Sequence, residues 1–121
     1  MDVLARQAIG AAIEVHRILG PGFSESVYES ALCHELQLRG VPFERQSLAQ
    51  VRYKDAEAGE YRLDILVGGS LVVELKAVER LLPVHSSQLI AYLKASNRKL
   101  GLLINFNVPR LKQGIKRIVV S

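Results

Sequence analysis

Apolar residues in the first third of the chain recur with the spacing of helices. Between Leu4 and Leu19 they fall three or four positions apart, which predicts a helix with one apolar face. Gly20-Pro21-Gly22 follows, and no helix continues through such a sequence. A second helix is expected from Ser24, a suitable N-cap, to Gly40, a glycine placed just after the helix. The chain therefore begins with two helices.

After Pro42 the pattern changes to that of β-strands. Lys54–Gly59 is a polar connection between the first two of them. The second and third are β-branched and apolar, and Gly68-Gly69-Ser70 between them is a strong signal for a hairpin turn. The three strands are expected over Phe43–Tyr53, Tyr61–Val67 and Leu71–Val78.

Helical and strand patterns alternate in the rest of the chain. Pro83 opens a helix that is expected to end near Asn97, and Asn107–Gly114 forms a turn with room for one helical turn. Two more strands are expected over Leu100–Phe106 and Ile115–Val120. The order ααβββαββ predicts an α/β fold (α+β mixed), in which helices flank a central mixed sheet. Residues 1–121 are expected to form a single domain.

The length of the predicted hairpin turn decides where two acidic residues point. A two-residue loop would pair Val67 with Ser70 and send Asp64 and Glu74 to opposite faces. A three-residue loop pairs Val67 with Leu71 instead, and Asp64 then lies directly opposite Glu74.

Burial favours the three-residue loop. In that register one face is wholly apolar, and a slip of one residue would scatter its members over both faces. This face contains Leu63, Ile65, Val67, Leu71, Val73 and Leu75. The other face contains Arg62, Asp64, Leu66, Val72, Glu74 and Lys76.

Two carboxylates opposite each other on neighbouring strands repel unless a cation lies between them. Asp64 and Glu74 would suit Mg²⁺, which takes oxygen ligands and keeps room for water and phosphate. Lys76, one pleat away, could orient a water molecule or offset charge that develops on a phosphate. Alternatively, Lys76 and Arg62 merely neutralise the two acids on a surface strand pair. The strands are predicted to be central, where uncompensated charges are rare, and this disfavours the alternative.

Three helical residues could complete such a site. Gln88 and Tyr92 are four apart and share a helix face, where they could hold a water molecule, a phosphate or a base. An ordinary amphipathic helix would show the same spacing. Glu25, in the first turn of the second helix, could be a third carboxylate that points at the metal. The helix dipole also favours an acid there by about 0.3–1 kcal/mol, without any metal.

Composition narrows the class of protein. Of 121 residues, 49% are hydrophobic and 23% charged, as in an average globular protein, and no apolar stretch approaches the roughly 20 residues of a membrane span. The N-terminus shows no secretory pattern. Cys33 is the one cysteine, so neither an internal disulfide nor a cysteine zinc site is expected. These features predict a cytoplasmic protein. The net charge of +4 is compatible with binding to a polyanion such as nucleic acid, but it does not require such a partner.

Several of these segments together resemble a known family. Gly22-Phe23-Ser24-Glu25-Ser26-Val27-Tyr28 matches the GxxExxY motif, and the chain resembles the GxxExxY proteins, a family placed in the PD-(D/E)xK nuclease superfamily. The resemblance covers nearly the whole chain and implies a restriction-endonuclease-like core. The other segments that carry the resemblance are Leu19–Phe23, Tyr61–Asp64, Val73–Val78, Leu82–His85 and Leu102–Phe106.

The resemblance implies a role for each candidate residue. Asp64 and Glu74 match the metal-binding acids of the superfamily, and Lys76 matches its catalytic lysine. Glu25 matches an acid contributed by an N-terminal helix, and Gln88 with Tyr92 match the QxxxY element of exonuclease-like branches. Leu63 departs from the pattern, because it stands where the superfamily name has proline.

The resulting hypothesis is a Mg²⁺-dependent nuclease that hydrolyses phosphodiester bonds in DNA, with Mn²⁺ as a substitute metal. Asp64, Glu74, the Leu75 carbonyl and Glu25 would hold the metal, while Lys76 positions the attacking water. One alternative is a catalytically inactive module that keeps the fold and binds nucleic acid or a protein partner. Another is a small homodimer that acts through an exposed sheet edge, with purely structural acids.

Overall fold

The computed structural model describes residues 2–121, and its elements follow the predicted order. The two N-terminal helices are α1 (Asp2–Leu19) and α2 (Glu25–Leu38), and the third is α3 (Pro83–Ala95). A short 3₁₀ helix, η1 (Leu111–Gly114), precedes the last strand. The strands are β1 (Phe43–Tyr53), β2 (Ala56–Val67), β3 (Leu71–Lys76), β4 (Leu100–Asn105) and β5 (Ile115–Val119).

The turn between α1 and α2 is held by a buried tyrosine. Gly20 takes a positive φ of 69°, a conformation that favours glycine, and ends α1. Tyr28 donates its hydroxyl hydrogen to the Gly20 carbonyl and accepts a hydrogen bond from the Phe23 amide. Its ring stacks on Phe106 at 4.5 Å between centroids. The last residue of the GxxExxY pattern therefore ties this turn to the core.

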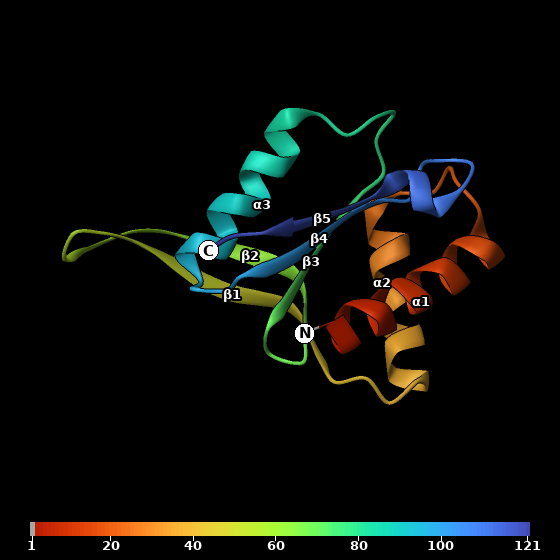
Figure 1. Ribbon diagram of the computed structural model, residues 1–121, viewed down its shortest axis with the longest axis horizontal. Coiled ribbons are helices and arrows are strands. Elements are labelled where there is room, and N and C mark those ends of the chain that lie inside the picture. The colour runs from red at the N-terminus through yellow and green to blue at the C-terminus, as the bar shows by residue number, and fades with distance from the viewer. Residues whose placement is uncertain (1) are drawn as a thin grey trace.

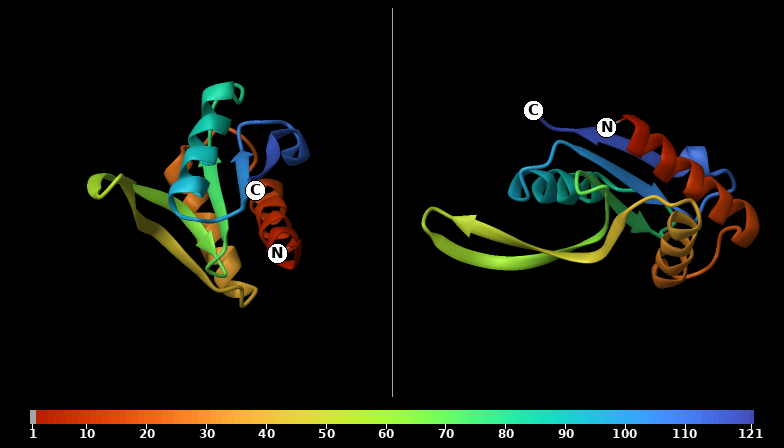
Figure 2. Two further views of the ribbon diagram at one scale, coloured as in Figure 1. Left: turned by 60° about the vertical axis from the view of Figure 1, so that its left-hand side comes forward. Right: turned by 90° about the horizontal axis from the view of Figure 1, so that it is seen from below.

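The five strands form one mixed sheet in the order β1-β2-β3-β4-β5 (Figure 1). Only β3 and β4 are parallel, and α3 connects them across one face of the sheet. α1 and α2 cover the other face and bury the larger apolar core, while a smaller core lies under α3 (Figure 2). The predicted mixed sheet flanked by helices is confirmed, and β2 and β3 are interior strands.

The hairpin between β2 and β3 has the register that burial favoured. Val67 pairs with Leu71 across a three-residue turn, in which Gly68 and Gly69 have positive φ. One detail of the prediction is wrong, because Leu63 packs in the core under α3 whereas Ile65 packs on the opposite side of the sheet. The change of face falls at Asp64, opposite Gln46, whose positive φ interrupts the pairing of β1 with β2.

The polar connection expected over Lys54–Gly59 is also shorter in the structure. β2 begins at Ala56 and pairs with β1 almost to the turn, with a register shift between Val51 and Arg52. The result is a long two-stranded hairpin that projects beyond the rest of the sheet (Figures 1 and 2). Across residues 2–121, none of the helices combines the length and apolar character that crossing a membrane requires.

Candidate functional site

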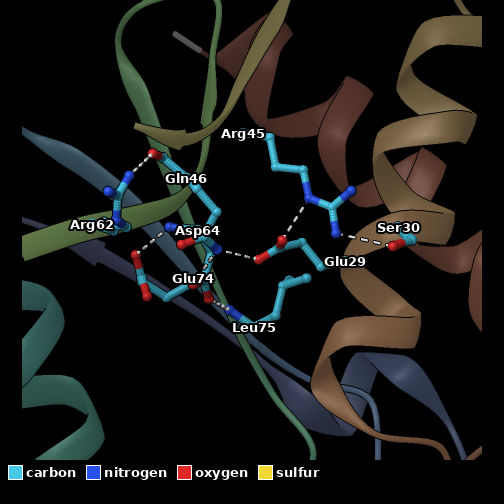
Figure 3. A network of polar contacts seen from close by, with 8 residues as sticks. All are labelled: Glu29, Ser30, Arg45, Gln46, Arg62, Asp64, Glu74 and Leu75. Carbon is cyan, nitrogen blue, oxygen red and sulfur yellow. Dashed lines mark hydrogen bonds and ion pairs between the residues drawn. The ribbon is translucent and has the colours of Figure 1, made fainter. Parts of the chain in front are cut away.

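Asp64 and Glu74 meet where β2 and β3 separate (Figure 3). Strand pairing ends at Ile65 and Val73, so these acids occupy the next position on each strand. The Asp64 amide donates to Glu74 Oε1 at 3.1 Å, and the Leu75 amide donates to Asp64 Oδ2 at 2.8 Å. Each carboxylate thus accepts a main-chain hydrogen bond from the other strand, which fixes the two groups beside each other.

Burial makes it costly for both acids to be ionised. Glu74 is only 5% exposed, and its burial, reinforced by the charge of Asp64, raises its pKa to about 8. The pKa of Asp64 is raised as well, first by burial and then by the nearby charge of Glu29. Near neutral pH the pair therefore retains a proton unless a cation compensates the second charge.

Lys76 and Gln88 meet beside the acids. Lys76 follows Glu74 by two residues on β3, so both side chains leave the same face of the strand. Lys76 Nζ donates to Gln88 Oε1 of α3 at 3.4 Å. Lys76 is half-buried and Gln88 is exposed, which places the amine on the accessible side of the carboxylates.

Tyr92 lies one turn beyond Gln88 on α3. Its ring stacks on Tyr61 of β2 with centroids 4.4 Å apart, and the Tyr61 hydroxyl donates to the Tyr92 carbonyl at 2.9 Å. The pKa of Tyr92 is raised by burial and then by the charges of Glu74 and Asp64. The structure therefore brings Gln88 and Tyr92 to the acids, on the side that α3 covers.

Glu25 lies elsewhere, and the acid that α2 brings to the site is Glu29. Glu25 is exposed in the first turn, whereas Glu29 is 9% exposed and faces the sheet one turn later. Glu29 Oε2 accepts a hydrogen bond from Arg45 Nε at 2.6 Å, within an ion pair. The sequence held a signal for Glu29, because it lies three and seven residues before Leu32 and Leu36, two core residues of the same helix.

Gln46 connects Glu29 to Asp64. Its side-chain nitrogen lies 2.6 Å from Glu29 Oε1 and 3.5 Å from Asp64 Oδ1 (Figure 3). The residue has a φ of 53°, which is uncommon for a non-glycine residue, and it interrupts the pairing of β1 with β2 between Arg45 and Ser47. Arg62 of β2 donates to its carbonyl at 3.3 Å. Sequence reasoning missed Gln46, because nothing in the alternation of β1 marks a left-handed residue.

The donor set fits a hard divalent cation. Asp64, Glu74 and the Leu75 carbonyl offer only oxygen ligands, and Mg²⁺ usually binds one or two carboxylates together with water and phosphate. A cation between the carboxylates would also compensate the charge that burial makes costly. In residues 2–121, no group of three or more His, Cys, Asp or Glu is placed to hold a metal ion, so a cage built from such side chains alone is not present. Water or substrate oxygens would have to complete the coordination.

Comparison with known proteins identifies a family. A family model described as the PD-(D/E)XK nuclease superfamily matches residues 2–118. No curated protein and no solved structure gives a significant match. The five-stranded mixed sheet with three flanking helices agrees with a restriction-endonuclease-like fold.

Proposed function

The chain belongs to the PD-(D/E)XK nuclease superfamily, and on this premise we propose that it is a metal-dependent nuclease that hydrolyses phosphodiester bonds in DNA. The proposal treats residues 1–121 as one nuclease domain of the GxxExxY type. The observation that carries it is the buried pair Asp64 and Glu74 with the Lys76 amine on its accessible side. A purely structural pair of acids in an interior sheet would not need a half-buried lysine beside it.

In this proposal the cation is held by Asp64, Glu74 and the Leu75 carbonyl, with Mg²⁺ as cofactor and Mn²⁺ as its substitute. When bound, such a cation supplies Lewis acidity toward the scissile phosphate and lowers the pKa of water. The protein's part is to keep both carboxylates fixed by main-chain hydrogen bonds before the metal and the substrate arrive.

Lys76 and the α3 residues act on the phosphate and the attacking water. Lys76 Nζ positions the water and offsets the negative charge that develops on the phosphate oxygens. Gln88 accepts a hydrogen bond from this amine and so restricts its direction. Tyr92, held by its stack on Tyr61, contacts the substrate strand from the same helix face.

We assign Glu29, and not Glu25, to the site, where it acts as a positioning residue and not as a metal ligand. Glu29 is buried and connected to Asp64 through Gln46, whereas Glu25 lies exposed at the start of α2. In this assignment Glu29 and Arg45 orient Gln46, and Gln46 holds one oxygen of Asp64. Glu25 then acts only on the helix dipole.

A cleavage assay tests the proposal. Purified wild type, Glu74→Gln and Lys76→Ala are incubated with supercoiled DNA, linear DNA and RNA in Mg²⁺, Mn²⁺ or EDTA. We expect DNA cleavage by the wild type with either metal and none in EDTA. Both variants should lose activity by at least a factor of about 100, since each removes a group that acts on the transition state.

The control variant is Lys54→Ala, which removes an exposed lysine from the tip of the β1–β2 hairpin and should keep full activity. Equal cleavage by wild type, Glu74→Gln and Lys76→Ala would show that the nuclease is a contaminant and would overturn the proposal. Cutting both strands of a duplex in one binding event would use two copies of the site, and light scattering measures whether the chain forms a homodimer.

One observation also suits a catalytically inactive binding module. Asp64 and Glu74 each accept a main-chain hydrogen bond, which gives them a structural role without any metal. Calorimetric titration with Mn²⁺ separates the two functions. The nuclease requires metal binding that Glu74→Gln abolishes, whereas the module predicts nucleic-acid binding without such metal affinity.

A further inference from the structure

Positive and negative side chains are separated along this chain. Residues 80–121 contain eight Lys and Arg and no Asp or Glu, hence a formal charge of +8. Residues 1–79 contain the other eight basic residues and all twelve acids, hence −4. A modest net charge of +4 thus conceals a strongly basic C-terminal third.

Folding gathers five of these basic residues along the outer strand β5. Lys116 and Arg117 belong to the strand, and Arg110 and Lys112 lie just before it, around η1. Lys99 lies at its other end, where its carbonyl accepts a hydrogen bond from the Val120 amide at 2.9 Å. All five are exposed, and we call them the β5 strip.

Pairing with acids does not account for four of the five residues of the β5 strip. Salt bridges join Arg17 to Glu14, Arg39 to Glu35 and Arg45 to Glu29. Within residues 2–121, four members form none: Lys99, Arg110, Lys112 and Lys116.

Protection of the sheet edge explains only part of the strip. Charged residues on an edge strand discourage pairing with another chain, and this is a sufficient reason for Lys116 and Arg117. Lys99, Arg110 and Lys112 lie outside the strand, where this reason does not apply. A second copy paired at β5 would also place like charges against each other, which disfavours a dimer through this edge.

One member of the β5 strip, Lys116, lies on the same face of the sheet as Glu74. Glu74 pairs with Leu103 of β4, and Leu103 pairs with Lys116 of β5. Directly paired residues point to the same face, so Glu74 and Lys116 share the α3 face of the sheet, two strands apart. Two strand spacings amount to about 10 Å. Leu103, the residue between Glu74 and Lys116, is fully buried in the core under α3, so a polyanion on the strip reaches the site only around that helix.

We propose that the β5 strip binds the phosphate backbone of duplex DNA outside the catalytic site. The inference rests on the proposed function and adds where the substrate lies. The five residues of β5 span about 17 Å, and phosphates of one strand follow each other every 3.4 Å or so along the helix axis. About five consecutive phosphates cover the same length, and Lys116 and Arg117 present charge on the two sides of this edge.

The aromatic residues of the basic segment favour a duplex over a single strand. Proteins that bind single strands combine a basic groove with exposed aromatic rings on which bases stack. Residues 80–121 contain two Phe or Tyr residues, of which Phe106 is fully buried and Tyr92 already stacks on Tyr61. The segment therefore offers charge for a backbone and no free ring for unpaired bases.

A binding experiment with charge-matched variants tests the strip. The strip variant carries Lys99→Gln, Lys112→Gln and Lys116→Gln. The control variant carries Arg6→Gln, Arg52→Gln and Lys54→Gln, three exposed positions on α1 and the β1–β2 hairpin, so the change in net charge is the same. Fluorescence anisotropy with a short DNA duplex in EDTA measures the affinity between about 50 and 200 mM salt, where no cleavage occurs.

We expect the strip variant to lose affinity by roughly tenfold or more at low salt, and the control by less than about threefold. The slope of log K against log salt should decrease by about 2–3 in the strip variant alone. Equal effects of the two variants would overturn the proposal, as would tighter binding of single-stranded DNA or of duplex RNA than of duplex DNA. If the wild type binds DNA through the strip but does not cleave it, the proposed nuclease activity is overturned, while the proposed DNA binding by the strip is supported.

Discussion

Glu74 carries its carboxyl group into an interior where ionisation is unfavourable. Its pKa of about 8 in the fold stands against an ordinary value of 4.5, chiefly because of burial and then because of Asp64. At a pH between 4.5 and about 8, Glu74 is protonated in the folded protein and ionised in the unfolded chain, so the folded protein binds more protons. Without divalent metal, the free energy of unfolding must therefore fall as the pH rises through this window.

The corresponding prediction concerns stability against pH. From pH 5 to pH 8 in EDTA, the wild type should lose on the order of 3 kcal/mol of unfolding free energy, because each unit of pKa shift is worth about 1.4 kcal/mol. Glu74→Gln cannot ionise and should show a much flatter dependence. Urea unfolding at several pH values measures both, and parallel curves for the two proteins would contradict the assigned burial.

How well the sequence predicts the site differs from residue to residue. The pairing of Asp64 with Glu74 followed from burial alone, because only one hairpin register buries the neighbouring apolar residues. Glu29 and Gln46 did not follow. The contact between Glu29 and Gln46 depends on how α2 packs against β1 and on the left-handed backbone at Gln46. A local hydrophobic pattern predicts neither of these features.

Among the secondary-structure elements, the α1–α2 turn shows how a sequence motif can serve the fold rather than the chemistry. Tyr28 is fully buried, and its hydroxyl bonds main-chain groups at Gly20 and Phe23. Its ring packs on Phe106, which follows β4. The motif that suggested the family therefore positions α2, and α2 in turn brings Glu29 to the sheet.

Tyr28→Phe tests this structural role. The ring and its stack on Phe106 are kept, while two main-chain groups lose their partner, so we expect a loss of about 1–2 kcal/mol in unfolding free energy. DNA cleavage below the unfolding transition should stay near the wild-type level. Tyr53→Phe, at an exposed position on the β1–β2 hairpin, is the control and should change neither quantity. Lost cleavage at unchanged stability would instead place Tyr28 in the chemistry.

Strand ends were harder to predict than strand order. β2 begins at Ala56 because it pairs with β1 almost to the turn, although its first residues are exposed and carry no apolar alternation. β3 ends at Lys76 and not at Val78, since the Val78 amide donates to the Asn105 side chain and so leaves the ladder. Long-range hydrogen bonds set these ends, and a local pattern does not contain them.

For the whole molecule, a cation bound by β2 and β3 would connect two strands in the middle of the sheet. Ligands that bind only the folded state raise the free energy of unfolding by RT ln(1 + [L]/Kd), about 2.7 kcal/mol at a hundredfold excess over Kd. For a chain of this size, that corresponds to a rise of roughly 10 °C in Tm. Because the raised pKa of Glu74 makes protons compete with the metal, the rise should be large at pH 8 and small at pH 5.5.

Scanning calorimetry with Mg²⁺ or Mn²⁺, at ionic strength matched with KCl, measures this prediction directly. Glu74→Gln should show no metal-dependent rise at either pH, whereas the strip variant, whose substitutions lie on and around β5, should respond like the wild type. The comparison separates the metal site from the proposed DNA surface within one fold. A rise of equal size in Glu74→Gln would place the metal elsewhere, and the acidic pair would then have only its structural role between β2 and β3.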